Sequence, residues 1–375
     1  MGLSIQRGEA YAESNVTVIG LTRVYGKPQY ILINSDDGNN PQLKFPGLRF
    51  RNSESSSETL EDVAVQRFNE QTGLTMNKSL GLRTIIPTRS RHGDRWIFRN
   101  VFLGVVENPN KRKQCDREVY VADPGQGFSE NEFVSELGNS GRRVPLDWVV
   151  DDNKIVAKVT TDFLHHFDWN TLSTNWYSRI PCLGVKPQTE AYNPELGCAL
   201  AVSSMILLYQ PNSNEKQKVI TLRRKDDKYP GYAGGKIETL KSHKSRNIDP
   251  ISCCAVEGSE EFGFEVQPRS LIGVATTPLF YPKGGERTHY NSIINYAFVA
   301  EPTNNEQVKL ALENPGNFLE TKMAEYVVED FDEHRDRVMK GELRMPDMMA
   351  IANEFYAGSP GSKINLSHIR ASGSV

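Results

Sequence analysis

The sequence predicts a mixed α/β (α+β) protein built from two domains of the same layout. Its 375 residues are enough for two ordinary domains. In each half, β-branched runs and a glycine turn precede an amphipathic helix that ends at a glycine. The two terminating glycines, Gly73 and Gly263, are 190 residues apart (263 − 73). Because solenoid repeats have periods of about 20–50 residues, this spacing indicates duplicated domains.

Composition narrows the class of protein. With 38% hydrophobic and 24% charged residues, the chain resembles soluble globular proteins. A net charge of −3 gives no global electrostatic case for nucleic-acid binding. The five cysteines are odd in number and lack CxxC spacing, which favours a reducing compartment over a zinc site. No apolar run approaches the ~20 residues that span a bilayer, and the N-terminus lacks an apolar signal core, so we expect a cytoplasmic protein without membrane contact.

The first half predicts a hairpin, a broken strand and a helix. Residues 16–34 form two β-branched runs around a turn cluster. Residues 43–50 follow as an apolar strand interrupted by Pro46-Gly47. The next segment places its apolar side chains at helical spacing, at Leu60, Val63, Ala64 and Phe68.

The rest of the first half sets the predicted domain boundaries. Strand-like runs cover 82–106, where Arg89, Arg91, His92 and Arg95 favour a solvated loop over an anion site. A terminal helix is predicted over 144–167. We therefore predict a first domain over 1–167, a proline-rich linker over 168–195, a second domain over 196–358 and a mobile tail over 359–375.

The second half contains the most informative stretch. After strands at 198–209 and 219–224, the glycine loop at 234–238 allows backbone to approach a ligand closely. Asp249 suits the N-cap of a helix with Pro250 at its first position, and Gly263 suits its left-handed end.

Three carboxylates lie on one face of this helix. The spacing of Glu257, Glu260 and Glu261 brings them within about one turn, where like charges repel. A solvated acidic face is the simplest interpretation of such a group. Apolar neighbours indicate instead that the helix is packed, and a divalent cation would offset the repulsion.

This stretch resembles the Nudix box, GX5EX7REUXEEXGU, where U is a bulky apolar residue. Gly235 opens the box, and residues 257–264, EGSEEFGF, match its EUXEEXGU end. The resemblance implies two Nudix-like α/β/α sandwich domains, each with a mixed β-sheet and a box helix. It also implies that Glu257, Glu260 and Glu261 are catalytic residues and ligands of Mg²⁺ or Mn²⁺, with Glu257 as a ligand or the general base.

The box departs from the family pattern at several positions. Val256 stands where the family has an arginine that orients the catalytic carboxylate, and Gly258 replaces the apolar residue. The isolated glutamate of the family has no clear match, although Glu238 and Asp249 are nearby acids. The loop after Gly235 is longer and carries a basic insert at 241–246.

The first copy is chemically degraded. When Gly73 is aligned with Gly263, Arg67 falls where Glu257 stands and Gln71 where Glu261 stands. Only Glu70 keeps a carboxylate, and Leu48 replaces the second glycine of the loop. We expect this domain to pack against the second, to grip substrate or to bind a partner.

Further site residues follow from the resemblance. Glu325, with Glu320 as the second choice, matches a loop acid that contacts a metal or the catalytic water in some members. The residues predicted to bind substrate are Arg223, Arg224, Tyr232, Gly234, Gly235 and Lys236. A solvated position is the alternative for one of the two arginines, and a core position is the alternative for Tyr232.

Two functions remain open. The first is a Mg²⁺-dependent hydrolase that cleaves the pyrophosphate bond of a nucleoside diphosphate linked to another moiety, with catalysis in the second domain. The alternative is an inactive Nudix-like protein that binds a nucleotide, RNA or a partner. The three glutamates favour the first, and Val256 and the basic insert favour the second. The sequence leaves monomer and homodimer equally open.

Overall fold

The computed structural model describes the chain in segments. They are residues 13–24, 27–34, 43–49, 59–76, 78–89, 96–106, 113, 115, 117, 119–122, 180–185, 198–237, 249–278 and 290–358. Several predicted features lie outside the described residues: Glu238, the insert at 241–246, the helix at 144–167 and the tail after residue 358.

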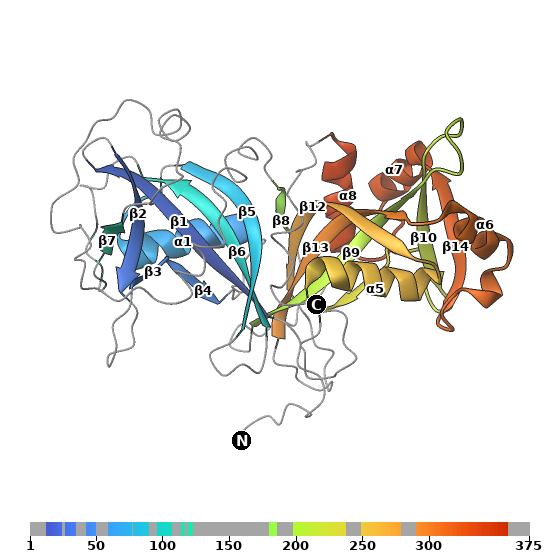
Figure 1. Ribbon diagram of the computed structural model, residues 1–375, viewed down its shortest axis with the longest axis horizontal. Helices are drawn as coiled ribbons and strands as arrows, with labels where there is room; N and C mark the ends of the chain where they lie inside the picture. Colours follow the sequence, from blue (N-terminus) through green and yellow to red (C-terminus); the bar gives the residue numbers. More distant parts are fainter. Residues whose placement is uncertain are drawn as a thin grey trace, which may run out of the picture.

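The first half is a mixed sheet with one described helix (Figure 1). Strand β1 pairs antiparallel with β2 and β4 and parallel with β6, and β5 pairs antiparallel with β6. The elements are β1 (Glu13–Val24), β2 (Lys27–Asn34), β3 (Leu43–Lys44), β4 (Gly47–Arg49), α1 (Leu60–Thr72), β5 (Lys78–Arg89), β6 (Trp96–Val105) and β7 (Val119–Ala122).

The second half repeats this order of pairings. Strand β9 pairs antiparallel with β10 and β11 and parallel with β13, and β12 pairs antiparallel with β13. The elements are β8 (Cys182–Gly184), β9 (Cys198–Tyr209), β10 (Lys218–Arg224), β11 (Gly234–Lys236), α5 (Pro250–Phe262), β12 (Val266–Pro278), β13 (Tyr290–Pro302), α6 (Asn305–Glu313), the 3₁₀ turn η3 (Pro315–Asn317), β14 (Met323–Asp330), α7 (Phe331–Lys340) and α8 (Pro346–Tyr356).

The two halves share one connected sheet. At its centre β1 pairs with β9, with Ser14 opposite Ala199. The buried hydroxyl of Tyr296 lies 2.7 Å from Ser14 Oγ and 3.0 Å from Asn100 Oδ1. Strand β8, within the predicted linker, pairs with β12, while the adjacent Ile180 bridges Leu82 of β5. The linker therefore contributes a strand between the halves (Figure 1).

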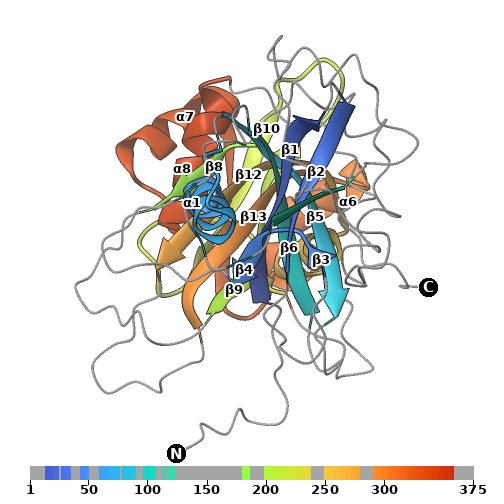
Figure 2. The same cartoon turned by 90° about the vertical axis from the view of Figure 1, so that its left-hand side faces the viewer.

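The second half has three layers, because side chains that alternate along its strands pack against helices on both faces of the sheet. Met205 and Leu207 of β9 belong to the core beneath α5, and Ile206 and Leu208 to the core beneath α7 and α8. Successive side chains of a strand point to opposite faces, so these helices cover opposite sides of the sheet. Figures 1 and 2 show this arrangement. The predicted α/β class, with helices layered on a mixed sheet, is confirmed.

The predicted helix ends are confirmed. Asp249 Oδ1 accepts hydrogen bonds from the N–H groups of Ile251 and Ser252, at 3.0 and 2.8 Å, and Pro250 opens α5. Gly73 and Gly263 end α1 and α5 with φ angles of 67° and 73°, the left-handed region that favours glycine.

Two further findings concern the described residues only. Cys115, Cys182, Cys253 and Cys254 form no disulfide bond with one another. No helix in this part of the chain is both long and apolar enough to cross a bilayer.

Candidate functional site

The predicted glycine loop forms the short strand β11, and its first two residues, Gly234 and Gly235, are called the glycine bend below. Glu261 holds this bend against helix α5. This carboxylate is only 3% exposed, and its Oε2 accepts a hydrogen bond from the Gly234 N–H at 3.1 Å. A Cβ on Gly234 would lie 2.4 Å from the Ser203 carbonyl oxygen, so only glycine fits here. The bend therefore meets the helix at the site that the sequence predicts.

Two of the three predicted carboxylates face this bend. A Cβ on Gly235 would lie 2.2 Å from Glu257 Cδ, so Glu257 stands directly against the second glycine. Glu257 and Glu261 are four residues apart and share one face of α5. Glu260 is exposed and lies on the outer side of the helix. Glu257 and Glu261 therefore lie together against the bend, as their spacing predicts. Glu260 lies apart from them.

Gly258 has a packing role. It is buried in the middle of α5, where a Cβ would lie 2.1 Å from Met205 Cε. The glycine therefore lets the helix approach β9 closely, which accounts for the missing apolar side chain at this position of the box.

Two cations neutralise Glu261. Its Oε1 lies 3.2 Å from Lys322 Nζ and 3.6 Å from Arg224 Nη2. Lys322 also pairs with Glu320 at 2.8 Å. Burial lowers the pKa of Lys322, but the hydrogen bond to Glu320 and the charge and hydrogen bond of Glu261 outweigh it, so this pKa lies above its ordinary value. The ammonium group therefore stays charged beside Glu261.

Glu325 points to the opposite face of the sheet. It forms an ion pair with Arg223 at 2.7 Å. The next residue, Tyr326, donates a hydrogen bond to the Phe262 carbonyl at 2.6 Å and so faces α5. Because neighbours on a strand alternate, Glu325 and Arg223 lie away from Glu261.

Two other residues predicted to bind substrate, Tyr232 and Lys236, lie in different environments. Tyr232 is buried, and its ring meets the His334 ring edge-on with centroids 5.6 Å apart. It packs in the core beneath α7 and α8. Lys236 is exposed at the end of β11.

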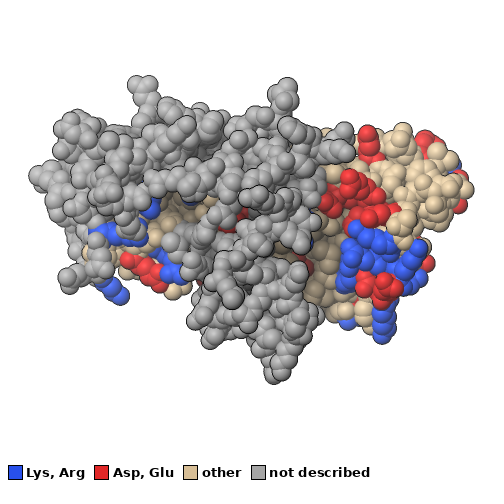
Figure 3. Space-filling model, turned by 90° about the horizontal axis from the view of Figure 1, so that it is seen from below, with Lys and Arg blue, Asp and Glu red and all other residues tan. Residues whose placement is uncertain are grey.

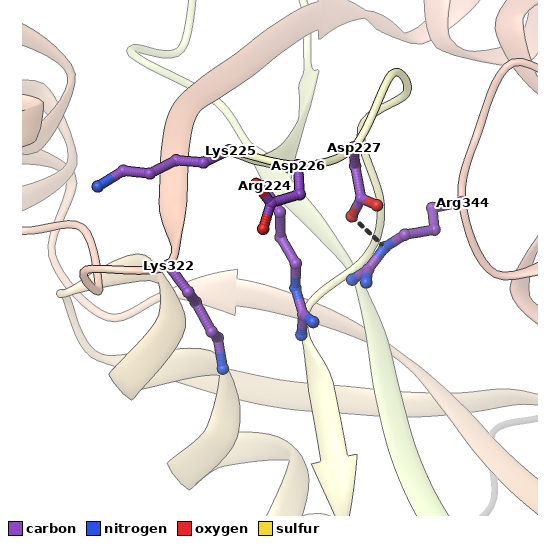
Figure 4. Close-up of a pocket in the computed structure, with 6 residues that line it drawn as sticks. All are labelled: Arg224, Lys225, Asp226, Asp227, Lys322 and Arg344. Atoms are coloured by element: carbon purple, nitrogen blue, oxygen red, sulfur yellow. Dashed lines mark ion pairs between the residues drawn. The ribbon is translucent and has the colours of Figure 1, made fainter. Parts of the chain in front are cut away.

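A pocket of about 380 Å³ opens beside Glu261. It is lined by Arg224, Lys225, Asp226, Asp227, Lys322 and Arg344. In Figure 4 the guanidinium groups of Arg224 and Arg344 approach each other, Lys322 extends toward the same region and Lys225 points away. Arg344 Nε lies 3.2 Å from Asp227 Oδ2. The lining thus carries four cationic and two acidic side chains.

The paired guanidinium groups leave hydrogen-bonding capacity unused. Arg224 Nε is buried and has no hydrogen-bond acceptor within the described chain, and the buried Arg344 Nε has the ion pair with Asp227 but no hydrogen bond of good geometry. Burial lowers the pKa of Arg344, the charge of Arg224 lowers it further, and Asp227 and Glu261 offset this only in part. Buried donors that lack acceptors and repel each other are satisfied by an anion with several oxygen atoms.

Lys322 and Arg344 carry no recognisable signal in the sequence. Both lie far from the box in the chain and reach the pocket only through the fold. Met345 has a φ of 75°, a conformation that is strained for a side chain of this size. The N–H of Arg344 donates to the Pro230 carbonyl at 2.8 Å. The turn that starts α8 thus directs Arg344 into the pocket.

The arrangement does not fit a divalent cation held by Glu257, Glu260 and Glu261 together. Among the described residues, no group of three or more His, Cys, Asp or Glu side chains converges as a metal site requires. Both oxygens of Glu261 already have partners. At about 4 Å and an effective dielectric constant of about 20, a divalent ion and an ammonium group repel by about 8 kcal/mol. Lys322 and a metal ion therefore compete for the same carboxylate.

The surface around the second half carries charges of both signs. In Figure 3, Lys and Arg side chains gather in one patch at the right-hand end, with Asp and Glu side chains beside them. This half therefore offers a local cationic surface although the whole chain has a net charge of −3.

No protein-family model matches the chain, and no curated protein matches it. Some solved structures align with part of it. A NUDIX hydrolase from Nitrosomonas europaea is 16% identical, aligns with 43% of this chain and 90% of its own, and has a TM-score of 0.29. A UDP-X diphosphatase is 14% identical over 54% of this chain and 80% of its own, with a TM-score of 0.27. Shewanella oneidensis NrtR in complex with a 27mer DNA is 14% identical over 29% and 50%, with a TM-score of 0.25. At these scores the likeness carries no conclusion about activity, and we infer function from the residues of this chain.

Proposed function

We propose that the second half of the chain binds a small anionic ligand of the nucleotide type through its phosphate or pyrophosphate group. The observation that carries this proposal is the convergence of Arg224, Arg344 and Lys322 in one pocket. Guanidinium groups bind phosphate oxygens through paired N–H donors, and an ammonium group adds a point charge. Glu261 forms ion pairs with two of the three cations, Arg224 and Lys322, and so holds them in place.

Calorimetric titration with sodium pyrophosphate tests this proposal. Arg344→Gln keeps a polar side chain but removes the charge, and we expect it to weaken binding about tenfold or more, because a hydrogen bond to a charged group contributes about 1.5–3 kcal/mol. The matched control is Arg269→Gln, which removes an exposed arginine paired with Glu301 outside the pocket. We expect it to leave pyrophosphate binding unchanged.

Two results would contradict the proposal. One is the absence of saturable pyrophosphate binding to the intact chain at low ionic strength. The other is equal weakening by Arg344→Gln and Arg269→Gln, which would point to a general charge effect.

The second candidate is the Mg²⁺-dependent pyrophosphohydrolase. The observation that favours it is the placement of Glu257 and Glu261 on one helix face against the Gly234-Gly235 bend. Its test is a screen with Mg²⁺ or Mn²⁺ against nucleoside triphosphates, ADP-ribose, NAD(H), dinucleoside polyphosphates and capped RNA. In a hydrolase, Glu261→Gln should lower turnover by orders of magnitude, and unchanged turnover would remove this site assignment.

RNA binding stays a separate prediction. It rests on the basic insert at 241–246, which lies outside the described residues. A pocket that fits pyrophosphate would also accept the phosphates of a capped RNA end, so capped RNA belongs in the same screen. Binding that disappears on addition of salt is the behaviour expected of such a contact.

A further inference from the structure

We propose that Lys322 and Arg224 stand in for the divalent cation, so that the pocket binds a pyrophosphate group without metal. This inference rests on the proposed function and concerns the chemistry of the same site. It arises because the carboxylate best placed to hold a metal ion, Glu261, is already neutralised by two side-chain cations.

The geometry around Glu261 supports this substitution. One oxygen of the buried carboxylate receives the Gly234 N–H, and the other lies within 3.6 Å of both cations. A metal ion at a box of this kind would neutralise Glu261 and present positive charge to phosphate oxygens. Lys322 and Arg224 meet both requirements. Arg224 ends β10 and Lys322 immediately precedes β14, and the pairing of Arg224 with Met323 brings the two cations close together.

Other charged residues around the pocket also support the proposal. Arg344 adds a third cation that contacts Asp227 and not Glu261. Glu320 holds the Lys322 ammonium from the other side, at 2.8 Å. The cations are thus positioned by carboxylates of the protein before any ligand arrives, a preorganisation that favours binding without a bridging ion.

The test uses the whole chain and two measurements. The first is calorimetric titration with sodium pyrophosphate in excess EDTA and in excess MgCl₂. We expect saturable binding in EDTA, at least as tight as in MgCl₂, and a loss of about tenfold or more in EDTA for Lys322→Met. Lys309→Met, on the exposed face of α6 and outside the pocket lining, is the matched control and should bind as the unchanged chain does.

The second measurement follows Mn²⁺ directly by electron paramagnetic resonance, without reference to activity. We expect no saturable Mn²⁺ site that depends on Glu261. A Mn²⁺ site that Glu261→Gln abolishes would overturn the inference, as would pyrophosphate binding that requires MgCl₂. Absence of pyrophosphate binding under both conditions would instead overturn the proposed function itself.

Discussion

The two halves of the molecule build the same contact from different side chains. In the first half, Gln71 Oε1 accepts a hydrogen bond from the Gly47 N–H at 2.9 Å, and its Nε2 donates to the Gly47 carbonyl at 3.2 Å. In the second half, Glu261 accepts from the Gly234 N–H at 3.1 Å. A neutral amide therefore suffices to hold the glycine bend against the helix. The carboxylate at residue 261 must serve another purpose, which we assign to the positioning of cations.

A second difference lies one helical turn earlier. Arg67 pairs with Glu70 along the surface of α1, at 2.5 Å, so this part of the helix is occupied by an internal ion pair. In the second half Glu257 stands against Gly235. The first half thus keeps the glycine and the helix of the site without the two carboxylates that face them in the second half.

The largest expected effect comes from exchanging the amide for an acid in the first half. Gln71 is 8% exposed, and in Gln71→Glu the new carboxylate would face the Gly47 carbonyl oxygen. We expect a destabilisation of about 3 kcal/mol, because a buried charge would replace a satisfied amide. Urea denaturation at pH 7 measures it, and recovery of stability at lower pH would identify the carboxylate as the cause. A variant as stable as the unchanged chain would show that the first half also tolerates a charge at the bend.

The glycines of the two bends should be equally intolerant of a side chain. A Cβ on Gly47 would lie 2.5 Å from the Val16 carbonyl oxygen, and one on Gly234 would lie 2.4 Å from that of Ser203. We expect Gly47→Ala and Gly234→Ala each to cost about 2–3 kcal/mol of unfolding free energy, since backbone must move to make room. Gly316→Ala is the matched control, because nothing lies within 4 Å of its Cβ position. If the two substitutions lowered the unfolding free energy by very different amounts, Gly47 and Gly234 would not be structurally equivalent.

A smaller effect concerns the pH dependence of stability, to which a histidine of the second half should contribute. Burial, with a further contribution from Arg337, lowers the pKa of His334 to about 4, and its Nδ1 lies 2.5 Å from the Tyr356 hydroxyl. None of the described residues of the first half is a histidine. The unfolded chain, with a pKa near 6.5, binds the proton more tightly than the folded chain. Stability from this group is therefore present above about pH 6.5 and lost as the pH falls toward 4.

At pH 5 the expected loss from His334 is about 2 kcal/mol. Urea denaturation at pH 7 and pH 5 measures it, with His334→Asn as the comparison, since the amide can keep a contact with Tyr356. The unchanged chain should lose about 2 kcal/mol more than the variant over this interval. An equal loss in both proteins would mean that His334 does not carry the acid sensitivity.

The frame of the site could be predicted from local sequence. Asp249, Pro250 and Gly263 mark the ends of α5 through local backbone chemistry, and the spacing of Glu257 and Glu261 predicts their shared face. The repeat is visible because Gly73 and Gly263 end equivalent helices.

Two of the three cations that complete the site, Lys322 and Arg344, could not be predicted in this way. Lys322 reaches Glu261 through the long-range pairing of β10 with β14. Arg344 reaches the pocket through the left-handed backbone at Met345. The face on which Glu325 lies depends on the register of a strand, because a shift of one residue exchanges the two faces. No local pattern specifies such a register.

The most direct test of the role assigned to Glu261 is the effect of Glu261→Gln on pyrophosphate affinity in excess EDTA. Gln71 shows that an amide can hold the equivalent bend, so we expect the variant to fold. Without the carboxylate that positions Lys322 and Arg224, these side chains must be ordered when the ligand binds, which should weaken pyrophosphate binding about threefold to tenfold. Pyrophosphate binding as tight as that of the unchanged chain, or tighter, would contradict this role.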